Sequence, residues 1–337
     1  MTTTLESIKA VVEAAQVKPV QTAQRGRKWA AAEILSAEFP EPKWAIPEIV
    51  PAGLIVLAGR PKLGKSWLAL QMAVAVGSGG MVLGKRVAAG KVLYLAFEDS
   101  ARRIQSRLLK QRATTDIAVD FHFDWEPLTG GTGVGRLIDE ITTNDYSLVV
   151  IDTISRALGK ADQTNAAEMN VVFGTLQQIA ISKNLAVILI DHHRKSASDV
   201  GDVIDDVMSA TSKTAVADAV LGLYRRRGER AATLKLAGRD VAEMELAITF
   251  DRDICCWQYQ GDVGEVRADE VQGQIVEALR NFGGTSTVSE IARYLGKQPP
   301  NISRELNELA SKGVVKRGDK AGKEVPWILA FRVLSEE

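Results

Sequence analysis

Short apolar runs alternate with helix-spaced apolar residues through most of the chain. The runs at 54–58, 91–97, 147–151 and 186–190 have the length and the branched side chains of buried strands, and a shorter run lies at 121–123. Apolar residues spaced three or four positions apart predict helices after the first run and at about 103–112, 137–142 and 166–183. The alternation predicts an α/β fold with a mostly parallel central sheet that is covered by helices on both faces.

The pattern changes toward the C-terminus. Apolar runs at 219–224, 231–237 and 245–250 follow one another in hairpin order and predict an antiparallel extension of the sheet. The chain from about 266 onward predicts three helices, at 268–281, 287–295 and 299–311, and a hairpin of 314–317 with 326–331. This order is typical of a small winged helix-turn-helix domain. We therefore expect a flexible N-terminal arm at 1–28, an α/β domain at 29–262 and a winged helix domain at 263–337.

Composition narrows the class of protein. The 337 residues are 46% hydrophobic and 25% charged, which is ordinary for a globular protein long enough for two domains. Acidic and basic residues balance at 42 each, so net charge neither indicates nor excludes a nucleic-acid partner. Because the apolar runs are strand-sized and the first residues lack a signal-peptide pattern, we expect no membrane association. The only two cysteines, Cys255 and Cys256, are adjacent and unsuited to a mutual disulfide or a metal site, which favours a reducing, cytoplasmic setting.

The loop after the first strand matches the phosphate-binding pattern G-x-x-x-x-G-K-[S/T]. Glycines in this pattern allow backbone conformations that side chains would block, so that loop N–H groups and the helix N-terminus face phosphate oxygens. Lys65 would neutralise charge on the β- and γ-phosphates of ATP, and the Ser66 hydroxyl would ligate Mg²⁺. The residues expected to bind the nucleotide here are Gly59, Arg60, Pro61, Lys62, Leu63, Gly64, Lys65, Ser66 and Trp67.

Acidic residues follow two more of the predicted strands. Ligands of open parallel sheets bind beyond the carboxyl ends of the strands, so Asp152, which ends the run at 147–151, should reach the Mg²⁺ of a bound nucleotide. Glu98 follows the run at 91–97 and can orient and deprotonate the water that attacks the γ-phosphate. The alternative is that Glu98 or Asp99 caps the next helix. Both roles can hold if Glu98 acts on water and Asp99 or Ser100 is the cap.

Further candidates lie beyond the last parallel strand. His192 and His193 can sense the γ-phosphate, or they can form a hydrogen-bonded structural pair. The loop at 196–206 contains four aspartates, which would repel the phosphates of DNA. Arg239 follows the strand at 231–237 and can stabilise transition-state charge in the site of a neighbouring subunit, a role for which 225–227 competes. A solvated basic turn is the ordinary alternative for both.

Taken in order, these motifs resemble the RepA-like branch of the RecA-type ATPases, which includes plasmid replicative helicases and many phage ATPases. The resemblance covers about residues 30–255 and rests on the proline-rich segment 39–47 and on 59–66, 94–100, 149–153, 192–195 and 235–240. It implies a RecA-like core, ATP hydrolysis between subunits and often a hexameric ring. Two features depart from the smallest plasmid helicases: the acidic loop at 199–206 and the appended winged helix. Both argue against DNA unwinding and leave the expected ATP hydrolysis unchanged.

The resemblance also implies roles by position. Lys65 and Ser66 correspond to the residues that hold phosphate and Mg²⁺, and Asp152 corresponds to a second Mg²⁺ ligand. Glu98 takes the place of the catalytic carboxylate. His193 is the expected sensor and Arg239 the expected trans-acting arginine finger.

The winged helix domain offers a second candidate surface. Its recognition helix would present Asn301, Ser303 and Arg304 to a DNA groove, and its wing would bring Lys316 and Arg317 near phosphates. Glu305 and Glu308 reduce the positive charge of that helix. Winged helices also dock proteins, so a protein partner stays open at this stage.

These observations predict an oligomeric, Mg²⁺-dependent ATPase that acts on DNA in plasmid or phage replication or recombination, with helicase activity as one form of that action. Single-stranded DNA would pass through the ring, and duplex DNA would meet the winged helix. The alternative is an ATP-controlled loader or regulatory switch that does not unwind DNA. A P-loop kinase would leave Glu98 and the winged helix without a role.

Overall fold

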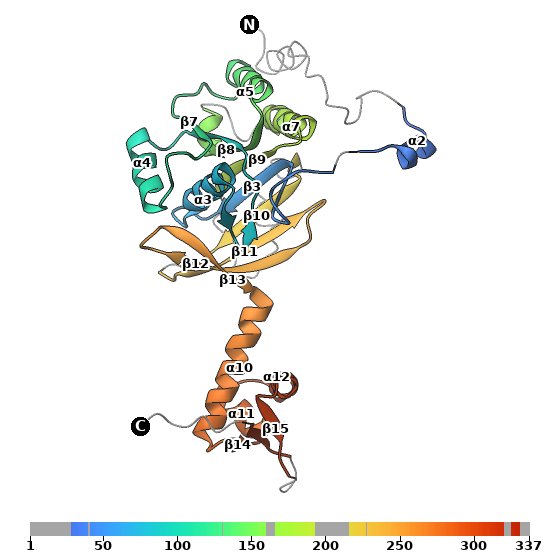
Figure 1. Cartoon of the computed structure of the whole chain (residues 1–337), viewed down its shortest axis with the longest axis vertical. Helices are drawn as coiled ribbons and strands as arrows, with labels where there is room; N and C mark the ends of the chain where they lie inside the picture. Colours follow the sequence, from blue (N-terminus) through green and yellow to red (C-terminus); the bar gives the residue numbers. More distant parts are fainter. Residues whose placement is uncertain are drawn as a thin grey trace. The chain divides into compact units, whose positions relative to one another are not determined.

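The computed structural model describes residues 28–39, 41–129, 131–159, 166–192, 216–226, 228–319 and 325–330. The chain divides between Gln260 and Gly261 into two compact units. The first unit is built around a sheet with the strand order β13-β12-β11-β10-β3-β9-β8-β6-β7 (Figure 1). The arm expected at 1–28 lies outside the described residues except for Lys28.

Six neighbouring strands of this sheet run parallel. Across the sheet they are β10 (Ala219–Tyr224), β3 (Gly53–Gly59), β9 (Ala186–His192), β8 (Tyr146–Asp152), β6 (Lys91–Ala96) and β7 (Val119–His122). Gly59 pairs with His192 and Ala96 pairs with Asp152, so the carboxyl ends of four strands meet at one edge. This arrangement confirms the predicted mostly parallel sheet and brings the loops that follow these strands together.

Three further strands extend the sheet beyond β10. They are β11 (Ala231–Gly238), β12 (Met244–Asp251) and β13 (Cys256–Asp262). The expectation that 219–224 would also be antiparallel to the core was wrong, because β10 pairs in parallel with β3 and only then antiparallel with β11. The stretch 193–218 between β9 and β10 is long enough for the crossover that a parallel strand requires.

Helices cover both faces of the sheet, as predicted. The helices that the structure describes in this unit are α2 (Ala31–Ser36), α3 (Lys65–Ser78), α4 (Ala101–Lys110), α5 (Thr132–Thr143), α6 (Ile154–Ala157) and α7 (Ala166–Lys183). Side chains of β3 alternate between the two faces of the sheet. Ile55 and Leu57 pack in the cluster that contains α3 residues, Leu54 packs in the cluster that contains α5 and α7 residues, and Val56 and Ala58 pack in a smaller cluster with β10 residues. The short strands are β1 (Trp44–Ile46), β2 (Val50–Pro51), β4 (Met81–Val82) and β5 (Lys85–Arg86). Burial of β3 on both faces leaves only its ends for polar chemistry.

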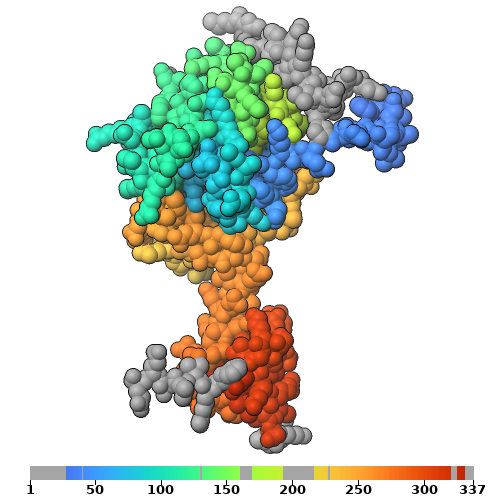
Figure 2. Space-filling model, viewed as in Figure 1, coloured from blue at the N-terminus to red at the C-terminus, as the bar shows by residue number. Residues whose placement is uncertain are grey.

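The second unit has the elements of a winged helix. They are α10 (Val263–Asn281), β14 (Thr285–Ser286), α11 (Val288–Leu295), α12 (Pro299–Ser311), β15 (Val315–Arg317) and β16 (Trp327–Leu329). Helix α10 begins five residues before the expected position because the Asp262 side chain caps it by accepting a hydrogen bond from Gly264 N. The three strands form a sheet in the order β14-β16-β15. Figure 2 shows the surface of each unit, coloured along the chain. Each unit has its own apolar core, and the core of the second unit includes Ile275, Ile302 and Trp327.

Candidate nucleotide-binding site

The phosphate-binding loop joins β3 to α3. Gly64 is the N-cap of α3 with φ 102°, a left-handed conformation that favours glycine. A Cβ on Gly64 would lie 3.1 Å from Cζ2 of Trp257, and one on Gly59 would lie 3.0 Å from the carbonyl oxygen of Leu223. Among the described residues, no side chain caps the N-terminus of α3. The loop and the first turn of α3 therefore have backbone N–H groups that can face an anion, which is the role that the sequence predicts for them.

Lys65 lies in the first turn of α3 and is 5% exposed. Its Nζ donates to the carbonyl oxygens of Gly59 at 2.8 Å and Arg60 at 3.1 Å, and it lies 3.2 Å from Nδ1 of His192. Burial lowers the pKa of Lys65 to about 8, against the opposing charges of Asp152, Asp191 and Glu98. The lysine is therefore held in place at the pocket, where its ammonium group suits a phosphate.

Asp152 ends β8 beneath the loop and is 2% exposed. Its Oδ1 accepts a hydrogen bond from Ser66 Oγ at 3.1 Å, and its Oδ2 accepts one from the buried Tyr94 hydroxyl at 2.8 Å. Burial raises the pKa of Asp152 to about 6, while the hydrogen bonds from Tyr94 and Ser66 oppose that rise. Tyr94 thereby fixes one carboxylate oxygen and leaves the other beside Ser66.

Ser66 and Asp152 fit a magnesium ion. Adjacent ligands of an octahedral Mg²⁺ with bonds of about 2.1 Å are about 3 Å apart. Ser66 Oγ and Asp152 Oδ1 are 3.1 Å apart, and both are hard oxygen donors. Two protein oxygens beside a phosphate-binding loop are the set with which proteins usually hold magnesium together with nucleotide phosphates.

Glu98 lies two residues beyond the end of β6 and lines the pocket. Its Oε1 accepts a hydrogen bond from Thr153 Oγ1 at 2.9 Å and lies 3.8 Å from Arg156 Nε. The side chain is 41% exposed. Ser100, and not Glu98, caps α4 by accepting a hydrogen bond from Arg103 N. Glu98 is therefore free of the capping role and is directed toward the pocket.

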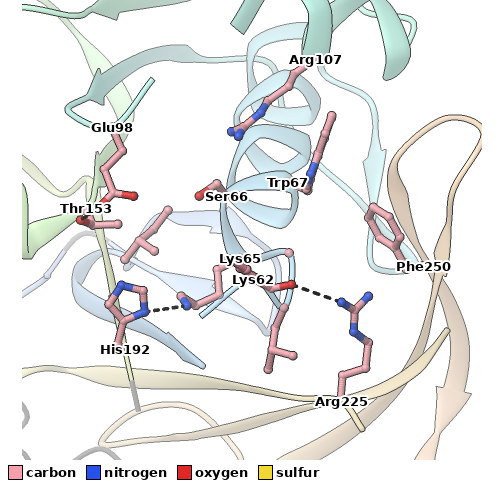
Figure 3. A pocket seen from close by; sticks show the side chains of 13 residues that line it. Lys62, Lys65, Ser66, Trp67, Glu98, Arg107, Thr153, His192, Arg225 and Phe250 are labelled. Atoms are coloured by element: carbon pink, nitrogen blue, oxygen red, sulfur yellow. Dashed lines mark hydrogen bonds between the residues drawn. The ribbon is translucent and has the colours of Figure 1, made fainter. Parts of the chain in front are cut away.

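These groups line one pocket of about 340 Å³ (Figure 3). The lining residues are Lys62, Leu63, Gly64, Lys65, Ser66, Trp67, Glu98, Arg107, Thr153, Ile190, His192, Arg225 and Phe250. Asp152 lies behind Ser66, and Arg60 and Pro61 are exposed at the outside of the loop. The structure thus brings together Lys65, Ser66 and Glu98, which were predicted from two separate motifs.

The histidine and arginine candidates lie in different places relative to the pocket. His193 lies outside the described residues, whereas His192 lies at the pocket beside Lys65. Arg225 also lines the pocket of its own chain, and its Nη2 is 3.4 Å from the carbonyl oxygen of Lys62. Arg239 lies near the amino ends of the parallel strands, opposite to the pocket, and its Nη1 is 3.9 Å from Asp218 Oδ1. The acidic loop at 196–206 lies outside the described residues.

His192, which ends β9, and Arg225, which follows β10, were both candidates from the sequence, His192 as a sensor of the γ-phosphate and 225–227 as an arginine finger. Sequence reasoning missed Thr153 and Phe250. Thr153 directly follows Asp152, so the rule that ligands bind at strand ends could have found it. Phe250 belongs to β12, far from the loop in sequence, and no local motif indicates it.

The candidate DNA-contacting residues of the second unit lie on its surface. Asn301 and Arg304 of α12 and Lys316 and Arg317 of β15 are exposed, and Ser303 is partly exposed. The guanidinium of Arg317 lies 4.7 Å from the centre of the Trp327 ring. The expectation that Glu305 reduces the charge of the outer helix surface needs correction.

Glu305 is 4% exposed and points into the unit. Its Oε2 accepts a hydrogen bond from Gln272 Nε2 of α10 at 3.0 Å, and its Oε1 accepts one from Arg304 Nη2 at 2.9 Å. These hydrogen bonds lower the pKa of Glu305, with the one from Gln272 contributing most. Glu305 thus holds α12 to α10 and orients Arg304, because burying a carboxylate requires such partners.

The phosphate-binding loop follows a strand in the middle of a mostly parallel sheet, and acidic residues lie at the ends of neighbouring strands. These features define a RecA-like P-loop nucleotide-binding unit. Residues 19–198, more than half of the chain, match the family described as AAA domain (AAA_25). The chain belongs to this family. Residues 269–323 match the MarR family, and the architecture is that of a RecA-type ATPase with a winged helix.

Similar curated proteins carry the name "DNA repair protein RadA". The Streptococcus pneumoniae protein is 25% identical over 204 residues, which are 56% of this chain and 44% of the relative. The Mycobacterium tuberculosis H37Rv protein is 26% identical over 156 residues, which are 45% of this chain and 29% of the relative. The matched part of this chain thus corresponds to less than half the length of these relatives.

A solved structure titled "Crystal structure of the RadB recombinase" is 19% identical and covers 62% of this chain and 91% of its own, with a TM-score of 0.42. Among the helices that the structure describes, none is both long and apolar enough to cross a membrane.

Proposed function

We propose that this chain is an oligomeric, Mg²⁺-dependent ATPase that acts on DNA in recombination, repair or replication. The observation that carries the proposal is the meeting of Lys65, Ser66 and Glu98 at one pocket, with Asp152 behind Ser66. An anion-binding loop, an oxygen pair for magnesium and a carboxylate across the pocket are the parts that phosphoryl transfer to water requires. The name of the curated relatives supports DNA as the partner.

The loop and Lys65 bind the triphosphate. Because Lys65 Nζ is already positioned by two loop carbonyls, little side-chain freedom is lost when phosphate oxygens approach. Ser66 and Asp152 would hold Mg²⁺, which when bound neutralises charge on the phosphate oxygens. His192, in contact with Lys65, can register the occupancy of the γ-phosphate position.

Glu98 acts as the general base. Thr153 and Arg156 hold its carboxylate at the pocket, where it can accept a proton from a water molecule. The oxygen of that water then forms a bond to the γ-phosphorus as the bond to the β-phosphate oxygen breaks, which leaves ADP and phosphate.

Arg239 is proposed to act in the pocket of a second subunit. It follows β11 at the edge where β3 begins, whereas the pocket lies where β3 ends, about 20 Å away for a seven-residue strand. Arg239 therefore cannot serve its own pocket by a side-chain movement. The proposal requires an assembly with the nucleotide between subunits, and the resemblance to ring ATPases favours a hexamer.

The winged helix is proposed to bind duplex DNA, and single-stranded DNA is proposed to occupy the ring. The match to the MarR family and the exposed Asn301, Arg304, Lys316 and Arg317 support the first part. Plasmid or phage replication, with helicase activity, is the form of this function that the resemblance to RepA-like ATPases favours.

The test is ATP turnover by the purified protein with and without single-stranded and duplex DNA, together with its mass in solution. We expect Mg²⁺-dependent turnover that DNA stimulates, in an assembly larger than a monomer. Turnover that ignores DNA, in a protein that retains no DNA, would contradict the proposed partner.

A second candidate function is an ATP-controlled loader or switch that recruits partners without unwinding DNA. The four aspartates at 196–206 favour it, because they oppose the passage of DNA phosphates. A forked substrate separates the two functions. A helicase releases the displaced strand in the presence of ATP, and a loader does not.

A further inference from the structure

The pocket has two chemically different halves (Figure 3). Glu98, Thr153 and His192 lie on one side, where the water would be activated. Trp67 and Phe250 lie on the other side, together with two arginines, Arg107 and Arg225. Lys65 and Ser66 lie between the halves. The proposed phosphate chemistry uses the first half and leaves the second without a role.

The second half is built from paired aromatic and guanidinium groups. The guanidinium of Arg107 lies 5.0 Å from the centre of the Trp67 ring. The guanidinium of Arg225 lies 5.8 Å from the Phe250 ring and 5.5 Å from the ring of the buried Trp257. These distances are those of cation–π contacts, which fix the orientation of the planar groups.

The rest of the chain holds these groups in position. Arg107 forms an ion pair with Asp99, and the backbone carbonyl of Trp67 accepts a hydrogen bond from Gln111 at 3.0 Å. Arg225 contacts the loop through the Lys62 carbonyl. The side chains come from α3, α4, the end of β10 and β12, so four separate elements converge on the second half. It is a preformed surface of flat groups.

The direction of a bound triphosphate brings its far end to this half. With its terminal phosphate near Glu98 and its chain held at Lys65 and Ser66, the other end of the molecule extends away from Glu98, toward Trp67 and Phe250. A nucleobase is a flat π system that stacks on aromatic rings and guanidinium planes. The second half therefore matches the chemistry of a nucleobase.

The polar groups of this half do not distinguish the edges of the purines. Among the described lining residues, the only carboxylate is Glu98, in the other half, and no asparagine or glutamine side chain lines the pocket. The exocyclic amine of adenine thus has no described side-chain acceptor, and the arginine donors can bind N7, an acceptor that both purines carry. Stacking tolerates any base, because every base has a π face.

We propose that Trp67, Phe250 and Arg225 form a nucleobase site that binds ring faces and accepts adenine and guanine nucleotides alike. This inference rests on the proposed function, since it requires a triphosphate at Lys65. It makes the substrate class purine nucleoside triphosphates rather than ATP alone.

The experiment compares three ligands by calorimetry with the full chain and excess Mg²⁺: ATP, GTP and inorganic tripolyphosphate. We expect the dissociation constants for ATP and GTP to agree within about fivefold, since stacking dominates. Trp67→Ala and Phe250→Ala should each weaken both nucleotides about tenfold, the loss of one stacking contact. Neither should change the affinity for tripolyphosphate, which has no base and also reports that the variants are folded.

Trp44→Ala and Phe123→Ala are matched controls, because both side chains are exposed, at 36% and 39%, and neither lines the pocket. They should leave all three affinities unchanged. ATP binding about a hundredfold or more tighter than GTP would overturn the nucleobase site while leaving the ATPase proposal intact. Equal weakening of nucleotides and tripolyphosphate by the two pocket variants would also overturn it. Absence of binding by any triphosphate would instead remove the proposed function, and the nucleobase site with it.

Discussion

The two units place their polar groups differently. In the ATPase unit, four of the described buried polar residues, Lys65, Asp152, Thr153 and Asp191, lie near the carboxyl ends of parallel strands and gather at one edge of the sheet. Thr175, in α7, is the exception. In the winged helix unit, the buried polar residues Gln272 and Glu305 lie between α10 and α12, and the buried Ser286 belongs to β14. The candidate partner-binding residues of the second unit are on its surface.

The polar cluster of the second unit is structural. Gln272 Nε2 donates to Glu305 at 3.0 Å and to Glu308 Oε2 at 2.8 Å, and Gln272 Oε1 accepts from Lys312 Nζ at 2.9 Å. Every polar atom of the Gln272 amide group thus has a partner inside the unit. The comparison shows that the parallel sheet determines where the candidate catalytic residues lie. In the winged helix unit, the buried polar residues stabilise the fold, and the candidate partner-binding residues lie on the surface.

The largest expected effect is that of Lys65→Ala on the first unit alone. Removing a cation that faces a buried phosphate should weaken nucleotide binding about a hundredfold or more and abolish turnover. DNA binding through the winged helix should be unchanged in the absence of nucleotide. Lys85→Ala is the control, because Lys85 pairs with Glu48 away from the pocket. Unchanged nucleotide affinity in Lys65→Ala would contradict the assignment of nucleotide binding to the strand-end residues of the first unit.

Two glycines, one in each unit, cap helices in a left-handed conformation, and substitutions at both test whether the loop of the first unit is more tightly packed. Gly64, with φ 102°, approaches Trp257, whereas Gly296, with φ 62°, has no neighbouring atom within 4 Å of the place that a Cβ would take. Gly64→Ala should lower the free energy of unfolding by about 1–3 kcal/mol and disrupt nucleotide binding. Gly296→Ala should cost about 1 kcal/mol and leave nucleotide affinity intact. Chemical denaturation and calorimetry measure both quantities, and equal effects of the two changes would contradict the proposed tight packing at Gly64.

The pH dependence of turnover should follow the strand-end residues. Asp152 loses the charge that would hold Mg²⁺ as the pH falls through its raised pKa of about 6. Lys65 loses its charge as the pH rises through its lowered pKa of about 8. We therefore expect kcat/KM to peak between these values and to decline about tenfold per pH unit on either side.

Tyr94→Phe tests the assignment of the acid limb. The hydrogen bond from Tyr94 lowers the pKa of Asp152, so its loss should move the acid limb to higher pH and leave the basic limb in place. A shift of both limbs, or of neither, in the pH profile would argue against Asp152 as the titrating group.

The smallest expected effects are those of single surface cations in the second unit. Arg304→Ala and Arg317→Ala should each weaken DNA binding a few-fold and reduce the salt dependence of binding by about one phosphate contact. ATP turnover without DNA should not change. Titrations at several salt concentrations measure the slope. A slope that stays constant in both variants would favour a protein partner for the winged helix.

Much of the ATPase unit could be predicted from sequence because its signals are local. The loop at 59–66 and the apolar strands before Glu98 and Asp152 each combine a burial pattern with a terminal polar residue. The parallel sheet then brings their ends together. The orientation of β10 was mispredicted, because a strand sequence does not encode the direction of its neighbour.

The rest of the pocket depends on contacts distant in sequence. Trp257 donates from Nε1 to the carbonyl oxygen of Gly64 at 3.2 Å, across 193 residues, and Phe250 reaches the pocket from β12. Neither has a local motif. Likewise, the helical pattern of α12 did not reveal that Glu305 would find a buried partner in Gln272.

The central claim is that residues at the ends of parallel strands form a site that hydrolyses ATP. The Glu98→Gln substitution tests this claim most directly. The change keeps the size of the side chain and removes its ability to accept a proton. Single-turnover hydrolysis, measured beside Mg·ATP affinity, should fall about a hundredfold or more while affinity stays within about threefold of the original. Unchanged hydrolysis in Glu98→Gln, with normal binding, would contradict the account.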